Sequence, residues 1–152
     1  MNAKSDRIER EVLIDAPRAR VWRALTDHEQ FGAWFLVRLE GPFVVGQRTC
    51  GQTTYPGYEH LAFEANVEAM DPETRFVFTW PQCDTETGKR YADEPPTRVE
   101  FLLDDVEGKT RVRVIESGFE RLSPAVRETV HRMNSGGWTE QMENIRKYAE
   151  AR

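Results

Sequence analysis

The two ends of the chain place the strongest constraint on what it can fold into. Residues 14–35, with the sequence IDAPRARVWRALTDHEQFGAWF, read as the end of a strand followed by a helix and a second short helix. Pro17 suits the first turn of a helix, because a proline there loses no hydrogen bond. Asp27 and Gln30 have the spacing of a capping box at the start of the second helix. One strand and two short helices are therefore expected at this end.

The other end, residues 123–152, predicts one long amphipathic helix. Ser123 is a favourable N-cap, and Pro124 suits the first helical position. Its single apolar face consists of Val126, Val130, Met133, Gly137, Trp138, Met142, Ile145 and Tyr148. The pair Gly136 and Gly137 costs about 2 kcal/mol relative to alanines in a helix interior. We therefore expect the helix to approach another backbone closely at this pair, or else to bend there.

Between the two ends, apolar and polar residues alternate as in strands of an antiparallel sheet. Strands are expected at residues 8–15, 35–40, 47–54, 61–69, 76–80, 98–103 and 111–117. A hairpin loop is expected at residues 104–109, and a long polar loop at residues 81–97. The long loop is either a solvated excursion or a lid. The pattern predicts an α+β fold in which a curved antiparallel sheet grips one long helix around an apolar hollow.

Composition limits the domain organisation and the function. A chain of 152 residues fits one domain, residues 1–152, and 39% hydrophobic residues are enough for a core. The formal net charge of −5 argues against a nucleic-acid partner. No apolar run approaches the roughly 20 residues of a membrane span. The start of the chain, MNAKSDRIER, has no apolar signal core, so we expect a cytoplasmic protein.

Cysteine and histidine give no support for a metal centre or a catalytic thiol. Cys50 and Cys83 are widely separated and form no CxxC pair, so two reduced thiols are expected. His28, His60 and His131 fall in separate predicted elements without any ligand spacing. No phosphate-binding glycine loop, GxSxG motif or paired catalytic carboxylates occur. We expect no metal, no cofactor and no catalytic residue, although catalysis is left open.

Motifs at both ends also carry a family resemblance. They are Ile14-Asp15-Ala16-Pro17, Val21-Trp22, Ala24-Leu25-Thr26-Asp27, Trp34-Phe35, Glu116-Ser117-Gly118-Phe119, and Gly137-Trp138 followed by Met142 and Ile145. The chain resembles the START-like superfamily, also called SRPBCC or helix-grip proteins. Within it, the chain is most similar to homologues of the activator of the ninety-kilodalton heat-shock protein ATPase. The resemblance implies a helix-grip fold with two short helices after the first strand. It does not select one function, because the superfamily includes lipid carriers, aromatases and cyclases, hormone receptors and chaperone cofactors.

Side chains that face the predicted hollow are the candidate ligand-binding residues. They are Phe63, Val67, Phe76, Phe78, Trp80, Val99, Phe101, Val112 and Glu116 from the strands, with Val130, Met133 and Gly137 from the helix. Each apolar member could equally be ordinary core. Large residues mixed with small ones are also what an unfilled cavity would need.

Glu116 is the most distinctive of these candidates, because the alternation along its strand places a carboxylate on the inward face. It either pairs with a cation, for which Arg10 and Arg48 are candidates, or lies at a solvated cavity mouth with a raised pKa. The functional interpretation is a polar anchor that orients an apolar ligand. On that interpretation, Glu116→Gln should change ligand affinity more than melting temperature.

Three functional hypotheses follow, in order of preference. The first is a non-enzymatic binder of a small hydrophobic or amphipathic molecule. The second is a chaperone cofactor that docks through its surface. The third is an enzyme of the polyketide aromatase or cyclase type, with Glu116 or His131 as general acid or base. A homodimer is compatible with all three.

Overall fold

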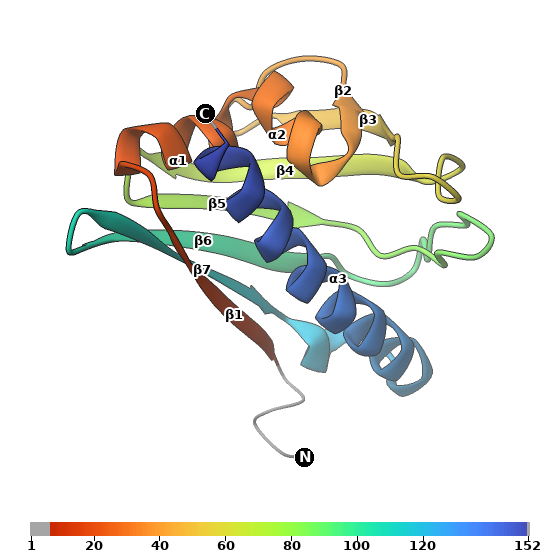
Figure 1. Ribbon diagram of the computed structural model, residues 1–152. Helices are drawn as coiled ribbons and strands as arrows, with labels where there is room; N and C mark the ends of the chain where they lie inside the picture. Colours follow the sequence, from red (N-terminus) through yellow and green to blue (C-terminus); the bar gives the residue numbers. More distant parts are fainter. Residues whose placement is uncertain (1–6, 152) are drawn as a thin grey trace.

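One antiparallel sheet of seven strands, with a long helix across one of its faces, forms the protein (Figure 1). The computed structural model describes residues 7–151. Its elements are β1 Arg7–Ile14, α1 Arg18–Thr26, α2 His28–Phe35, β2 Val37–Leu39, β3 Arg48–Thr53, β4 Ala62–Asp71, β5 Arg75–Trp80, β6 Thr97–Val106, β7 Lys109–Ser117, the 3-10 helix η2 Phe119–Arg121 and α3 Pro124–Glu150. The strand order is β1-β7-β6-β5-β4-β3-β2, so the first strand pairs with the last. The predicted α+β fold is confirmed.

Side-chain alternation decides which face of the sheet meets α3. In β6, Val99, Phe101 and Leu103 are buried, and in β7 Val112 and Val114 are buried on the same face. The aromatic residues of β5 continue this buried layer, and α3 supplies Val130, Trp138, Met142, Ile145 and Ala149 to the same core. The inward pattern read from the sequence is therefore the core of the fold.

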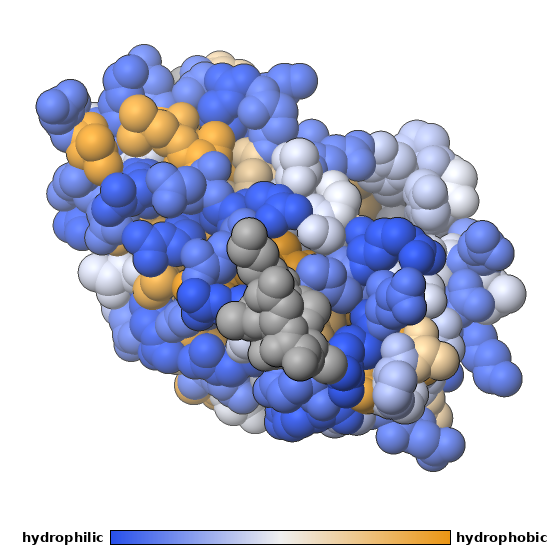
Figure 2. Space-filling model, turned by 90° about the horizontal axis from the view of Figure 1, so that it is seen from below, coloured by the Kyte–Doolittle hydropathy of each residue, from blue (hydrophilic) through white to orange (hydrophobic). Residues whose placement is uncertain are grey.

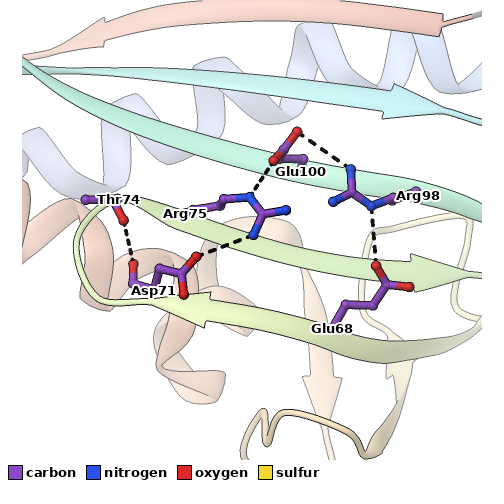
Figure 3. A network of polar contacts seen from close by, with 6 residues as sticks. All are labelled: Glu68, Asp71, Thr74, Arg75, Arg98 and Glu100. Atoms are coloured by element: carbon purple, nitrogen blue, oxygen red, sulfur yellow. Dashed lines mark hydrogen bonds and ion pairs between the residues drawn. The ribbon is translucent and has the colours of Figure 1, made fainter.

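The opposite face of the sheet is covered by charged side chains. Arg75 of β5 donates through Nε to Glu100 of β6 at 2.6 Å, and Arg98 of β6 donates to Glu68 of β4 at 3.3 Å. Figure 3 shows this network on the side away from α3, where Asp71 and Thr74 extend it. Because this face carries a continuous network of partly exposed ion pairs, it faces solvent.

The short helices after β1 form as expected at their start. The side chain of Asp27 accepts hydrogen bonds from the backbone N–H groups of Glu29 and Gln30, so Asp27 is the N-cap of α2. The expected strand at residues 35–40 is wrong at its beginning. Phe35 ends α2 and stacks on Phe31 one turn earlier, with ring centroids 4.8 Å apart. Leu36 then takes a left-handed conformation, with φ of 64°, which ends the helix.

The hairpin between β6 and β7 is tighter than expected. Val106 pairs with Lys109, so the turn consists of Glu107 and Gly108 alone, both with positive φ. Figure 2 shows the molecule from below the view of Figure 1, where the surface is predominantly hydrophilic and its hydrophobic residues form small separate groups. None of the helices within residues 7–151 is both long and apolar enough to cross a membrane.

Candidate functional site

A cavity of about 560 Å³ lies between the middle of α3 and the segments that join the strands at one end of the sheet. Its walls come from α2, the β3–β4 segment, the end of β5, the β5–β6 loop and α3. The lining residues are Phe35, Leu36, Thr53, Tyr55, Tyr58, Leu61, Trp80, Thr85, Arg132, Met133, Asn134, Gly136, Gly137, Trp138, Glu140 and Gln141. Most of the wall is apolar or aromatic, and its formal charges are Arg132 and Glu140.

A second cavity of about 250 Å³ adjoins the first beneath the β5–β6 loop. The two share Phe35, Thr53, Leu61, Trp80, Thr85 and Asn134 as lining residues. The smaller cavity is also lined by Cys83, whose thiol has a raised pKa, chiefly because of burial. A raised pKa keeps a thiol protonated, so Cys83 is not set up as a nucleophile.

Two stacked tryptophans form part of the wall of the larger cavity. Trp80 at the end of β5 and Trp138 of α3 stack, with ring centroids 5.6 Å apart and planes inclined by 25°. Phe35 packs against both, at 6.2 Å from Trp80 and 6.3 Å from Trp138. Aromatic pairs in stacked and inclined arrangements such as these restrict one another's orientation, so this wall is preorganised.

Glu116 lies directly behind that wall and accepts hydrogen bonds from it. Trp80 Nε1 donates to Oε2 at 2.9 Å, and Trp138 Nε1 donates to Oε1 at 2.8 Å. Asn134 Nδ2 lies 3.1 and 3.0 Å from the two carboxylate oxygens, and Thr97 Oγ1 donates to Oε2 at 2.5 Å. Three of these four donors line the cavity, whereas Glu116 does not. The carboxylate therefore orients the lining from beneath it.

Burial raises the pKa of the Glu116 carboxyl, and the hydrogen bonds from its four donors partly offset that rise. The prediction of a cation partner is wrong, and so is that of a solvated position, because Glu116 is fully buried among neutral donors. The β1 register explains the first error, since Ile8 rather than Arg10 lies opposite Glu116. Arg10 reaches Ser135 and Thr139 of α3 instead. Arg48 lies 3.9 Å from Glu64.

The twelve candidate residues fall into three groups in the structure. Trp80, Met133 and Gly137 line the larger cavity, and Phe63 and Trp80 line the smaller one. Glu116 supports the larger cavity from behind. The others lie in the buried core and line neither cavity: Val67, Phe76, Phe78, Val99, Phe101, Val112 and Val130.

Several lining residues were not expected from the sequence. On α3 they are Arg132, Asn134, Gly136, Glu140 and Gln141, and helical spacing could have found them. Asn134 precedes Trp138 by one turn, and Gln141 follows Gly137 by one turn. No local signal places Tyr55, Tyr58 and Leu61, because the path of the β3–β4 segment depends on tertiary contacts.

One of the two purposes expected for the glycine pair of α3 is excluded. A Cβ atom built on Gly136 or Gly137 would meet no atom within 4 Å. The expected close approach to another backbone is therefore absent at both positions. Instead, both glycines line the larger cavity.

Neither side chain named for acid–base chemistry is part of the cavity wall. His131 packs its ring on Phe119, with centroids 5.0 Å apart, and its Nε2 lies 3.3 Å from the backbone oxygen of Arg7. Glu116 is shielded behind the tryptophans. Across the described residues 7–151, no three His, Cys, Asp or Glu side chains are grouped so that they could hold a metal ion.

A seven-stranded antiparallel sheet, two short helices after β1 and a C-terminal helix packed across the sheet define the START-like, or SRPBCC, class of helix-grip proteins. Within this class the chain belongs to the family described as Activator of Hsp90 ATPase homolog 1-like protein, whose model matches residues 15–150. No curated protein matches the chain significantly.

Solved structures agree with this fold. A protein from Arthrobacter aurescens has 19% sequence identity and a TM-score of 0.80, over 100% of this chain and 90% of that one. The Aha1 dimer from Colwellia psychrerythraea has 18% identity and a TM-score of 0.69, over 95% and 96%. DynU16, a protein from the dynemicin biosynthetic locus, has 22% identity and a TM-score of 0.73 over 95% of this chain. The match covers only 47% of DynU16, so this chain spans about half of its length.

Proposed function

We propose that the protein binds a small hydrophobic or amphipathic molecule in the larger cavity. The observation that carries this proposal is the cavity itself, about 560 Å³ of space beneath α3. The space opens to solvent, because Tyr58, Arg132 and Glu140 of its lining are exposed, so a molecule can enter it. A volume in the range of about 300–1,000 Å³ with a mainly apolar lining is typical of small-molecule sites.

The polar groups of the lining suit an amphipathic ligand better than a purely apolar one. Thr53, Thr85 and Asn134 add hydroxyl and amide groups to a wall made mostly of aromatic and aliphatic side chains. Arg132 and Glu140 add one charge of each sign from α3. Ligand sites usually combine an apolar lining with a few polar groups that fix orientation.

The test is a titration with N-phenyl-1-naphthylamine, a neutral probe that fluoresces when it enters an apolar site. We expect saturable binding of one probe per chain, with quenching of tryptophan fluorescence, because Trp80 and Trp138 line the cavity. Leu61→Arg places a charge in both cavities and should abolish binding. Leu13→Arg is the matched control, since Leu13 is 46% exposed on β1 and lines neither cavity. Absent saturation, or equal binding by the two variants, would refute the proposal.

The natural ligand would be sought by native mass spectrometry of the protein purified from its own host. We expect a retained molecule in the wild type and none in Leu61→Arg. A molecule that stays bound to both proteins would be attached elsewhere on the surface.

A second candidate function is a chaperone cofactor, favoured by the family description, which names an activator of Hsp90 ATPase. Such a cofactor would act through its surface and would not need the cavity. If the protein stimulates the ATPase of the host's ninety-kilodalton chaperone, and Leu61→Arg stimulates it equally, the cofactor function is favoured. The aromatase or cyclase hypothesis stays a prediction. Neither Glu116 nor His131, the two residues named as its general acid or base, lines the larger cavity.

A further inference from the structure

The two glycines of α3 occupy the middle of the helix surface that faces the cavity. Residues four apart lie above one another on a helix, so two rows form, Arg132–Gly136–Glu140 and Met133–Gly137–Gln141. All six residues line the larger cavity. Each row therefore has a long side chain at either end and bare backbone between them.

Nothing in the local structure requires glycine at these positions. The helix continues without interruption from Pro124 to Glu150. Neither glycine takes the positive φ that favours glycine, and a Cβ at either position would enter open space. Alanine would stabilise the helix interior, since glycine is among the poorest helix formers. The feature that distinguishes both positions is the cavity in front of them.

We propose that Gly136 and Gly137 form a recess in the helix wall that selects flat ring systems as ligands. This inference rests on the proposed function and specifies its ligand class. Trp80 and Trp138 stack at the cavity wall, and the ring of Phe35 is inclined to them by 60° and 64°. The helix backbone at the recess has its own hydrogen bonds within the helix, so it presents a smooth surface without free donors. A planar aromatic molecule can lie against the bare helix backbone and contact the neighbouring rings, whereas a flexible chain gains less contact and loses more conformational entropy.

The test compares two competitors with the same carboxylate, anthracene-2-carboxylate and dodecanoate, in displacing N-phenyl-1-naphthylamine. For the wild type we expect the aromatic acid to displace the probe at a concentration about tenfold lower. Gly136→Ala and Gly137→Ala should each weaken the aromatic acid about fivefold and change dodecanoate by less than about twofold. Gly137→Leu should abolish displacement by the aromatic acid, because its side chain fills the recess.

Thermal unfolding separates the recess from a structural role. Both alanine variants should melt about 2–4 °C above the wild type, because the helix gains stability without a steric clash. Gly41→Ala is the matched control: a Cβ there also meets nothing within 4 Å, and Gly41 lines neither cavity. Its affinity for both competitors should equal that of the wild type.

The outcomes distinguish this inference from the proposed function. The wild type could bind the probe while the alanine variants bind the aromatic acid unchanged or more tightly. In that case the proposal that the two glycines select the ligand is wrong, and the proposed binding function of the cavity stands. A lower melting temperature in the alanine variants would show that the glycines serve the fold, which also overturns the recess. If the wild type binds no probe, the proposed function fails and the recess fails with it.

Discussion

Glu116 connects the hydrogen bonding of the core to the shape of the cavity. A buried carboxylate loses its hydration, and this loss is offset only if other groups donate to it. Its donors include the indole N–H groups of Trp80 and Trp138 and the amide of Asn134, which all line the cavity. The carboxylate thus fixes the orientation of a wall that it does not itself form.

Glu116→Gln should lower both stability and ligand affinity. The new amide N–H₂ must face at least one indole or amide N–H that can only donate, so at least one hydrogen bond is lost. We expect the free energy of unfolding at pH 6 to fall by about 2 kcal/mol. Affinity for N-phenyl-1-naphthylamine should fall as the tryptophans shift. Urea unfolding and probe titration measure the two effects.

The control for this substitution is Glu128→Gln, at an exposed position on α3. It should leave both measurements unchanged. An unfolding midpoint of Glu116→Gln equal to that of the wild type would show that the donors around Glu116 do not depend on its carboxylate. The expectation from the sequence, that affinity would respond more than melting temperature, assumed a carboxylate within the cavity.

The raised pKa of Glu116 gives its contribution to stability a definite pH dependence. A carboxyl whose pKa is higher in the folded than in the unfolded state binds more protons when folded. Its contribution is complete below the ordinary pKa of 4.5 and is lost as the pH rises through the folded value. The difference in unfolding free energy between the wild type and Glu116→Gln should therefore be largest near pH 4.5 and decrease at higher pH.

Urea unfolding of both proteins between about pH 4.5 and pH 8 measures this difference. The subtraction cancels the other carboxylates, including Glu143, whose pKa is lowered by its hydrogen bond to Arg146. A difference that stays constant or grows with pH would show that the pKa of Glu116 is not raised by burial.

Helices and strands are the level at which the sequence is most informative. Alternation in β4 to β7 is enforced by one buried face, so most residues read as inward are buried. Ala69 is an exception, because a register shift after Val67 pairs it with Val77. The spacing in α3 likewise predicts Trp138, Met142 and Ile145 as buried residues. Alternation gives the face of a side chain but not the space in front of it. For this reason most of the predicted ligand-binding residues, such as Phe76 and Phe101, lie in packed core.

Packing of α3 on β1 includes a polar connection as well as apolar contacts. Arg10 of β1 donates through Nε to Thr139 Oγ1 at 3.0 Å, and its guanidinium lies 2.7 Å from Ser135 Oγ. Both partners belong to the part of α3 that carries the glycine pair. This connection holds the middle of the helix against the sheet edge, where the helix itself is weakened by the two glycines.

Arg10→Met should loosen the middle of α3 while retaining the apolar stem of the side chain. We expect a loss of about 1–2 kcal/mol in unfolding free energy, since the two hydroxyl partners lose a charged donor. Amide hydrogen exchange should become faster around residues 134–140 than in the strands. Arg38→Met, at an exposed position on β2, is the control and should change neither. Uniformly faster exchange across the whole chain would contradict a local connection.

The boundary of the cavity is set by contacts between segments far apart in the chain. Tyr55 of the β3–β4 segment donates to Glu140 Oε1 of α3 at 2.5 Å. Thr85 of the β5–β6 loop lies 3.5 Å from the sulfur of Met133, and its backbone oxygen is 2.9 Å from His60 Nε2. These contacts join both loops to α3 and to each other across the space beneath the helix. Sequence patterns are local, so they predict that a loop exists but not which helix it contacts.

Tyr55 and Glu140 form the polar contact between the β3–β4 segment and the helix, and they should control the rate at which a ligand enters and leaves. Their hydrogen bond raises the pKa of Tyr55 above its ordinary value of 10, so the phenol remains a donor even in alkaline solution. Tyr55→Phe removes this contact and keeps the ring that lines the cavity. We expect association and dissociation of N-phenyl-1-naphthylamine to become about threefold faster. The dissociation constant should be almost unchanged, because the substitution leaves the lining of the cavity the same.

Stopped-flow fluorescence measures both rate constants, and Tyr58→Phe provides the matched control. Tyr58 lies on the same segment, lines the same cavity and packs its ring on Tyr55 at 5.6 Å. Because Tyr58 does not donate to Glu140, its variant should keep the wild-type rates. Equal acceleration in the two variants would assign the effect to general loosening of the segment. Unchanged rates in Tyr55→Phe would show that ligands pass elsewhere, and the loop that carries Thr85 would then be the segment to test as the lid.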